Sequence, residues 1–223
     1  MERSAVAIII PAYNEQETIS AVVQKVKPFG TVIVVDDASK DDTAALAQEA
    51  GAVVVRHFKN KGYDGALNSG FSKANELGCS YAITFDADGQ HDASLIANYL
   101  DLLQNQNYDL VLGVRAKKAR ISENLIGVYF KLRFGIKDIL CGMKGYRMRL
   151  YKKNGGFDHI HSIGAELAMI SVKSKCRFVQ VPVSIYHRIG KARFGNVIKS
   201  NVKIIYALCK LIILDSFKEH FER

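Results

Sequence analysis

Short apolar runs, mostly of β-branched residues, recur along the first half of the chain, and segments with helical spacing separate them. The runs predict strands at residues 5–10, 32–35, 52–55, 82–85 and 110–113. The segments between them predict helices near residues 15–27, 41–50, 64–77 and 92–106. Because the runs are almost continuously apolar, both faces of the sheet should be covered by helices. Crossovers of this length predict a mostly parallel, Rossmann-like α/β sheet flanked by helices.

The second half of the chain has a looser pattern of apolar and polar positions. It predicts a helix near 122–134, a strand at 143–148, a helix from about 164 to 174, a strand at 178–186 and a final helix over 195–221. No repeat or linker divides the chain, so a single domain over 1–223 is expected.

The sequence pattern leaves the environment of two segments open. The aromatic residues Tyr129, Phe130 and Phe134 suit a core or a lipid-facing groove, and residues 202–214 suit a helix at a membrane interface or one packed on the sheet.

Charge divides the chain more sharply than hydropathy does. Residues 1–114 carry 8 basic and 15 acidic side chains, whereas residues 115–223 carry 23 basic and 7 acidic ones, for a net charge of +9 overall. We expect metal handling in the acidic half and contact with an anion or a membrane in the basic half. No pattern of a nucleic-acid-binding module is present, so a nucleic-acid partner is not expected. Four scattered cysteines and the lack of a secretory signal or membrane span indicate a cytoplasmic protein.

Three unusual loops follow the first, second and fourth predicted strands, at residues 11–15, 36–43 and 86–91. The carboxyl ends of parallel strands meet at one edge of a sheet, where ligands bind. That edge would gather the carboxylates of Glu15, Asp36, Asp37, Asp86 and Asp88, which repel one another unless a cation compensates. Asp86, Asp88 and Gln90 offer hard oxygen ligands for Mg²⁺ or Mn²⁺. Taken singly, these segments are also compatible with helix caps and an acidic turn.

Together the motifs resemble the family 2 glycosyltransferases of the GT-A fold, and within them the polyprenyl-phosphate (dolichol-phosphate mannose type) synthases. Six ordered segments carry the resemblance: PAYNE at 11–15, VVDDASKDDT at 34–43, NKGYDGALNSGF at 60–71, FDADGQH at 85–91, DILCGMKGYR at 138–147 and VPVSIYHRIGKARFG at 181–195. The resemblance implies an inverting, metal-dependent transferase that uses a UDP- or GDP-sugar. It also implies work at the cytoplasmic face of a membrane, through peripheral contact or a small membrane partner.

The resemblance also assigns roles on the nucleotide-sugar side, residues 1–114. It implies that Asp37 contacts the base, that Gly62 and Gly65 let the chain pass close to the donor, and that Asp88 takes part in catalysis. The metal set would be Asp86, Asp88 and Gln90, with His91 as a structural neighbour. The full donor-binding set would be Pro11, Tyr13, Asn14, Glu15, Asp37, Gly62, Asp86 and Ala87. For Asp37, helix capping is the alternative role.

On the acceptor side, residues 115–223, the resemblance implies an anion held by Arg188, Lys191 and Arg193, and Arg115 is expected to be a further acceptor-binding cation near them. The branch usually has Ser-Lys where this chain has Ala192-Arg193. Glu166 is the candidate catalytic base, with a surface position or pairing with a nearby arginine as the alternative, and Arg188 would assist transfer.

The acceptor remains open between two classes. A polyprenyl phosphate is favoured, because a phosphate monoester is already anionic at pH 7 and needs no base. A sugar hydroxyl of a glycan is the alternative.

Two interpretations from other functional classes are a signalling receiver domain and a non-catalytic nucleotide-binding scaffold. In a receiver, however, the acidic pair follows the first strand, whereas here it follows the second.

Overall fold

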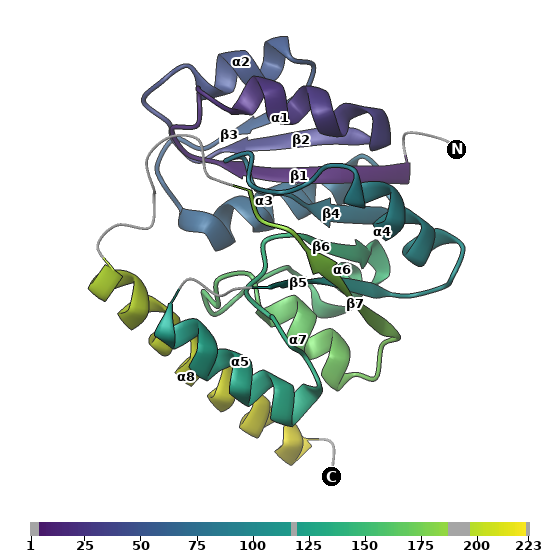
Figure 1. Ribbon diagram of the computed structural model, residues 1–223, viewed down its shortest axis with the longest axis vertical. Coiled ribbons are helices and arrows are strands. Elements are labelled where there is room, and N and C mark those ends of the chain that lie inside the picture. Colours follow the sequence, from purple (N-terminus) through teal and green to yellow (C-terminus); the bar gives the residue numbers. More distant parts are fainter. Residues whose placement is uncertain (1–4, 117–119, 187–196, 222–223) are drawn as a thin grey trace.

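The computed structural model describes residues 5–116, 120–186 and 197–221, and within the last segment the side chains of 200–216. A seven-stranded sheet with the order β3-β2-β1-β4-β6-β5-β7 runs through it (Figure 1). The strands are β1 (Val6–Ala12), β2 (Thr31–Asp36), β3 (Val53–Arg56), β4 (Tyr81–Thr84), β5 (Leu110–Arg115), β6 (Lys144–Arg147) and β7 (Phe178–Val183). The helices are α1 (Ile19–Val26), α2 (Thr43–Glu49), α3 (Gly62–Glu76), α4 (Leu95–Gln104), α5 (Ile121–Phe134), α6 (Met148–Asn154), α7 (Glu166–Lys173) and α8 (Val197–Phe221), with a 3₁₀ turn at Lys27–Phe29.

The sheet is parallel except for one strand. β1 pairs with β2 and β4, β2 with β3, and β5 with β7, all in parallel register. β6 lies between β4 and β5 and is antiparallel to both. The predicted mostly parallel α/β sheet is therefore confirmed. The carboxyl ends of β1, β2 and β4 lie at the same edge, on the left in Figure 1.

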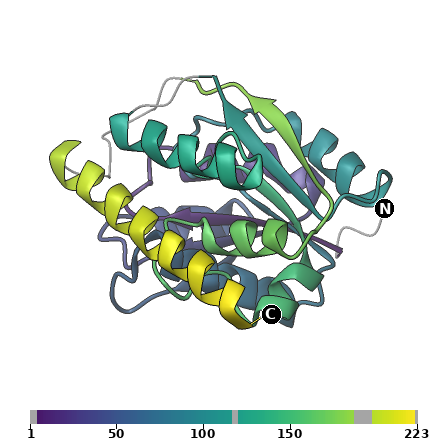
Figure 2. The same ribbon diagram turned by 90° about the horizontal axis from the view of Figure 1, so that it is seen from below.

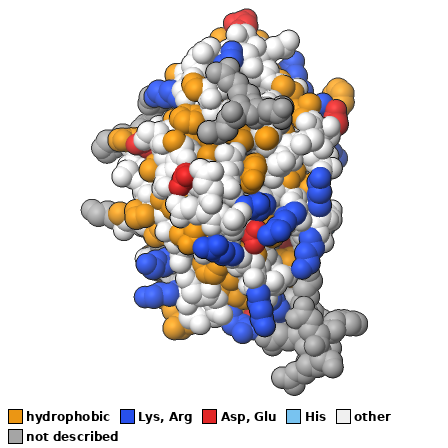
Figure 3. All heavy atoms as spheres, turned by 90° about the vertical axis from the view of Figure 1, so that its right-hand side faces the viewer, with side chains coloured by type: hydrophobic (Ala, Val, Ile, Leu, Met, Phe, Trp, Pro, Cys, Tyr) orange, Lys and Arg blue, Asp and Glu red, His pale blue; other side chains and the backbone are white. Residues whose placement is uncertain are grey.

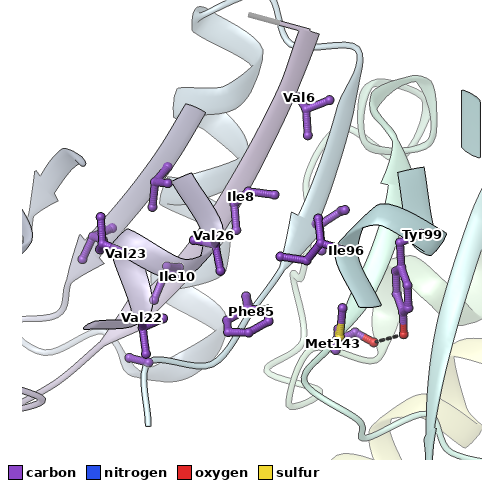
Figure 4. Close-up of a cluster of buried hydrophobic side chains, with 14 of the residues drawn as sticks. Val6, Ile8, Ile10, Val22, Val23, Val26, Phe85, Ile96, Tyr99 and Met143 are labelled. Atoms are coloured by element: carbon purple, nitrogen blue, oxygen red, sulfur yellow. Dashed lines mark hydrogen bonds between the residues drawn. The ribbon is translucent and has the colours of Figure 1, made fainter. Parts of the chain in front are cut away.

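Helices cover both faces of the sheet, as the continuously apolar strands require. α1, α2 and α4 pack on one face, where side chains such as Val23, Ile96 and Tyr99 form a core with β1 and β4 (Figure 4). The Tyr99 hydroxyl donates to the carbonyl of Met143 at 3.4 Å, which ties α4 to the segment before β6. α3, α5, α6, α7 and α8 contribute to the core on the other face. α5 and α8 form the outermost layer there (Figure 2).

Several element boundaries differ from those expected from the sequence. α1 begins at Ile19 rather than residue 15, because the Glu15 carbonyl accepts from the amides of Thr18 and Ile19 in a preceding turn. α7 begins at Glu166 because Gly164, with φ +69°, cannot continue a right-handed helix. The short helix α6 was not predicted. The stripe Tyr129, Phe130 and Phe134 belongs to the core, with Phe130 fully buried.

Part of the basic excess lies at the edge opposite the acidic loops. Arg147, Arg149 and Lys152 line a hollow beside Tyr81, at the start of β4. Both arginines approach the buried carboxylate of Asp109. Figure 3 shows Lys and Arg side chains gathered over the lower part of this side of the molecule. These cations therefore lie apart from the carboxyl ends of β1, β2 and β4.

Candidate active site

The loops after β1 and β2 form one hydrogen-bonded unit. The Asn14 amide donates to Ser39 Oγ at 2.9 Å, and the Lys40 amide donates to Asn14 Oδ1 at 2.8 Å. The Glu15 amide donates to Thr43 Oγ1 at 2.8 Å. Asn14 adopts a left-handed backbone conformation (φ 53°), which asparagine tolerates better than most residues. The first two predicted donor segments therefore lie side by side and support each other.

Asp37 fastens this unit to the start of α3. Its carboxylate lies 2.6 Å from His57 Nδ1 and accepts from the amides of Lys61 and Gly62, both at 2.8 Å. His57 Nε2 in turn lies 2.8 Å from the Ser69 hydroxyl. Helix capping, the alternative role given for Asp37, is thus present at the start of α3. Recognition of a nucleotide base by Asp37 stays a prediction.

The carboxylates of Asp36 and Glu15 also interact with groups of the protein. Asp36 is buried, accepts from the Ser39 amide at 3.2 Å and lies 3.5 Å from Arg56 Nε. Glu15 is buried and receives a long hydrogen bond from Thr18. Hydrogen bonds and an ion pair within the protein therefore reduce the repulsion expected between these acidic groups. Pro11 and Tyr13, beside them, are only partly buried, so a nucleotide-sugar could reach them.

Asp86, at the end of β4, has the most elaborate surroundings. His91 Nε2 lies 2.9 Å from Asp86 Oδ2, and the Tyr63 hydroxyl donates to Asp86 Oδ1 at 3.4 Å. A methyl group on Gly142 would lie only 2.1 Å from Asp86 Oδ2, so any side chain at this position would displace the carboxylate. The Asp86 side chain nevertheless keeps 30% of its surface exposed, as a ligand-binding carboxylate needs.

Electrostatics keep Asp86 ionised. Burial alone would raise its pKa, but the hydrogen bond and charge of His91, with the charges of Lys144 and Arg115, lower the pKa below its ordinary value. His91 Nδ1 is buried and has no hydrogen-bond partner among the described residues. His91 therefore serves Asp86 through Nε2 alone, which agrees with the structural role expected for it.

Asp88 and Gln90 complete the acidic loop. The Gln90 amide donates to Asp88 Oδ1 at 3.1 Å, and Gln90 Nε2 donates to the Tyr186 carbonyl at 3.0 Å. The Tyr186 amide donates back to the Gln90 carbonyl, and His91 forms a β-bridge with Ile185. Gln90 thus joins the acidic loop to the chain that follows β7. Its role as a metal ligand stays a prediction.

The carboxylates of Asp86 and Asp88 suit a hard divalent cation only if the substrate supplies further ligands. Among the described residues, no group of three or more His, Cys, Asp and Glu side chains is arranged to hold a metal ion. Asp86 and Asp88 offer carboxylate oxygens, and Asp86 is held in the ionised form that binds a cation. Mg²⁺ and Mn²⁺ accept such oxygens and commonly share a substrate's phosphates. The residues therefore fit a cation that arrives with a diphosphate.

A buried ion network beside Asp86 was not predicted. Arg115 Nε and Nη2 donate to the two oxygens of Asp138 at 2.7 and 3.0 Å, and Nη2 lies 3.2 Å from Glu123. Burial alone would lower the pKa of Arg115, but the hydrogen bond and charge of Asp138 outweigh burial and raise the pKa above its ordinary value. The Lys144 ammonium, also buried, donates to the Gly164 carbonyl at 3.0 Å. Arg115, expected to bind the acceptor, is thus anchored first within the fold.

The Glu166 carboxylate is hydrogen-bonded by the loop that precedes α7. Its carboxylate accepts from the His159 amide at 2.6 Å and from the Ile160 amide at 3.1 Å, and it lies 2.7 Å from His159 Nδ1. The Glu166 side chain is almost fully buried. Its alternative role, pairing within the protein, is thus present, with a histidine rather than an arginine. Action as a catalytic base stays a prediction.

The same loop contains a second carboxyl group that is paired across the fold. Asp158 accepts from the Ser162 amide and hydroxyl, and it shares a hydrogen bond with Asp64 of α3. Asp64 accepts from the Gly164 amide at 2.6 Å. Burial and the charge of Asp158 raise the pKa of Asp64 to about 6. No motif in the sequence marks this pair, because its members are far apart along the chain.

Three predicted acceptor residues, Arg188, Lys191 and Arg193, lie outside the described residues. The described segment that precedes them in the sequence stops at Tyr186, which lies beside Gln90 of the acidic loop. Their anion-binding role stays a prediction.

Comparison with known proteins bears on the whole chain. The family model described as glycosyl transferase family 2 matches residues 7–155. The chain is 30% identical to the UDP-N-acetylglucosamine–dolichyl-phosphate N-acetylglucosaminyltransferase of Methanococcus voltae, and the alignment covers 95% of this chain and 97% of that one. It is 28% identical to the polyprenol monophosphomannose synthase of Mycolicibacterium smegmatis, with 88% and 84% covered.

Solved structures show the same fold. Glucosyl-3-phosphoglycerate synthase from Mycobacterium tuberculosis, in complex with Mn²⁺, UDP and glucosyl-3-phosphoglycerate, superimposes with a TM-score of 0.68. The match covers 92% of this chain and 79% of that one at 17% sequence identity. At this identity the likeness concerns the fold, which is that of the GT-A transferases.

Proposed function

Because the chain belongs to glycosyl transferase family 2, we propose that it transfers a sugar from a UDP- or GDP-linked donor to a polyprenyl phosphate. That the protein is a glycosyltransferase follows from the family; the donor and the acceptor are the proposal. The names of two relatives support the acceptor, since one acts on dolichyl phosphate and the other makes polyprenol monophosphomannose. Their alignments span 95% and 88% of this chain, including the half that would contact the acceptor.

In this proposal Asp86 and Asp88 hold Mg²⁺ or Mn²⁺ against the donor diphosphate. The cation, when bound, neutralises negative charge on the leaving nucleoside diphosphate. His91 contributes by fixing Asp86 Oδ2. A structural relative was solved with Mn²⁺ and UDP together, which supports this pairing. The unit built on Asp37 would hold the nucleoside beside α3.

The state of Glu166 is the observation that favours a phosphate acceptor. A sugar hydroxyl needs a positioned base, worth roughly 10²–10⁴-fold in rate. The Glu166 carboxylate is already engaged by two backbone amides and His159. A phosphate monoester, with a second pKa near ~6, attacks as an anion without such a base. Its oxygen bonds to the anomeric carbon opposite the departing diphosphate; the carbon–diphosphate bond breaks and the centre inverts.

The acceptor side would therefore supply cations rather than a base. In the proposal Arg188, Lys191 and Arg193 hold the lipid phosphate, with Arg115 nearby. Since polyprenyl phosphates reside in membranes, the protein would act peripherally at the cytoplasmic face.

A direct assay tests the proposal. Purified protein is incubated with Mn²⁺, a panel of UDP- and GDP-sugars and a water-soluble short-chain polyprenyl phosphate, and products are identified by mass spectrometry. We expect a prenyl-phosphate sugar from at least one donor, with a rate that rises as the phosphate ionises near pH ~6 and is then level. If only a sugar hydroxyl is glycosylated, the polyprenyl-phosphate assignment is wrong.

A further inference from the structure

The outer face of the α5–α8 pair is unusually apolar. The two helices lie side by side (Figures 1 and 2), and Tyr129 and Arg133 of α5 both donate to Asp215 of α8, at 3.1 and 2.8 Å. Their inner faces are already buried, through Phe130 on α5 and Leu211 on α8. Packing against the sheet is thus complete on one side, and the opposite side faces outward.

Helices on a protein surface normally direct polar residues outward. On α5 the exposed residues include Ile121 at 79% and Leu132 at 82% exposure. On the part of α8 with described side chains, residues 200–216, eight positions are exposed and only Lys203 and Ser216 are polar. The apolar residues of this outer face are Ile121, Leu125, Val128, Leu132, Val202, Ile205, Tyr206, Cys209, Ile212 and Ile213. A patch of this extent on two neighbouring helices marks an interaction surface.

The charges on the same helices indicate the kind of partner. The acidic side chains described on α5 and α8, Glu123 and Asp215, are both buried and engaged by arginines. The exposed charged side chains described there are Lys131, Arg133 and Lys203. A two-fold contact between copies would place this surface against itself and bring like charges together. An anionic lipid surface instead complements an apolar face bordered by cations.

We infer that the outer face of α5 and α8 docks on the interface of an anionic lipid bilayer. The inference rests on the proposed function, in which the acceptor is a membrane lipid. No helix among the described residues is long and apolar enough to cross a membrane, so docking is in the plane of the interface. The apolar side chains enter the boundary between headgroups and acyl chains, and Lys131 and Lys203 contact the headgroups.

Docking on this face is connected to the candidate site. Lys210 of α8 donates to the carbonyls of Ile160 and His161, in the loop that ends at Glu166. Gly164 of that loop accepts from Lys144, whose charge acts on Asp86. Hydrogen bonds therefore connect the docking helix to the loop before α7, and that loop to Lys144.

The experiment uses one substitution at two exposed positions. Leu132→Glu alters the docking face, whereas Leu77→Glu makes the same change at the exposed end of α3, outside that face. Ile213→Glu repeats the test on α8. The full chain is mixed with vesicles containing about 30% phosphatidylglycerol, and bound protein is measured by co-sedimentation. We expect wild type and Leu77→Glu to bind equally, and Leu132→Glu and Ile213→Glu to bind at least about tenfold more weakly.

A second measurement separates this inference from the proposed function. With a water-soluble short-chain polyprenyl phosphate, all the variants should match wild type; with a long-chain acceptor in vesicles, the two docking variants should be slow. Vesicle binding unaffected by Leu132→Glu and Ile213→Glu overturns the docking surface. So does a dimer that these variants dissociate, since a second copy then covers the face. Absence of transfer to the soluble acceptor by wild type contradicts the proposed function alone and leaves the vesicle result to decide docking.

Discussion

The buried pair Asp64 and Asp158 makes the stability of the fold depend on pH in a direction opposite to the usual one. Burial and the Asp158 charge raise the pKa of Asp64 from an ordinary 3.8 to about 6. A group with a raised pKa contributes its full stabilisation below the unfolded value, and that contribution is lost as the pH rises through the folded value. Asp64 therefore stabilises the protein at pH ~4 and no longer does so above pH ~6.

The magnitude follows from the shift. About two pKa units at ~1.4 kcal/mol each correspond to roughly 3 kcal/mol between the two protonation states. Asp64→Asn removes this dependence, because an asparagine oxygen still accepts from the Gly164 amide and its NH₂ still donates to Asp158. We expect the variant and wild type to be about equally stable near pH ~4. Near pH 8 the variant should be more stable by about 2–3 kcal/mol.

Urea unfolding followed by far-ultraviolet circular dichroism across this pH range measures the difference. Glu49→Gln, at an exposed position near the end of α2, serves as the control for removing a carboxylate. The reasoning is refuted if the stability curves of Asp64→Asn and wild type run parallel from pH ~4 to 8, or if the variant is the less stable protein at pH 8.

Three further changes address the donor side. Asp88→Asn should keep the fold but abolish transfer, and wild type should lose activity in excess EDTA; full activity in EDTA would exclude a required cation. Asp37→Ala should weaken nucleotide affinity by roughly ten- to a hundredfold in calorimetry, and should cost about 1–3 kcal/mol of stability by leaving His57 and the partly buried amides at the α3 start without their acceptor. Gly142→Ala should displace Asp86, since the new methyl group would lie 2.1 Å from Oδ2. An unchanged Mn²⁺ affinity in this variant would contradict the placement of the metal.

The sequence predicts those parts of the structure that depend on local pattern. Strands such as β1 and β2 were predictable because parallel strands covered on both faces are continuously apolar. β6 carries Lys144 and Gly145 and is weak by this criterion, and its antiparallel direction has no local signal. Helix starts were predicted too early where a turn or a left-handed residue such as Gly164 precedes the helix.

The candidate site divides in the same way. The Asp-x-Asp loop is recognisable because its residues are adjacent in sequence. The partners that decide the roles of Asp37 and Glu166 were not predictable, since they depend on which loops fold against each other. Asp37 and His57 are 20 residues apart, and Arg115 and Asp138 are 23 apart. Only the assembled fold shows that these ionisable groups are already paired.

The insertion of β6 between β4 and β5 has a consequence for the order of assembly. β5 pairs with β6 and β7 but not with β4, so residues 1–114 include most of a strand that has no neighbour among them. β4 and β5 are therefore joined in one sheet only when β6, which ends at Arg147, is present between them. A fragment ending near residue 114 would then carry an exposed apolar edge prone to aggregation. The acidic half, residues 1–114, is thus not expected to fold as an independent unit, because strands of the basic half complete its sheet.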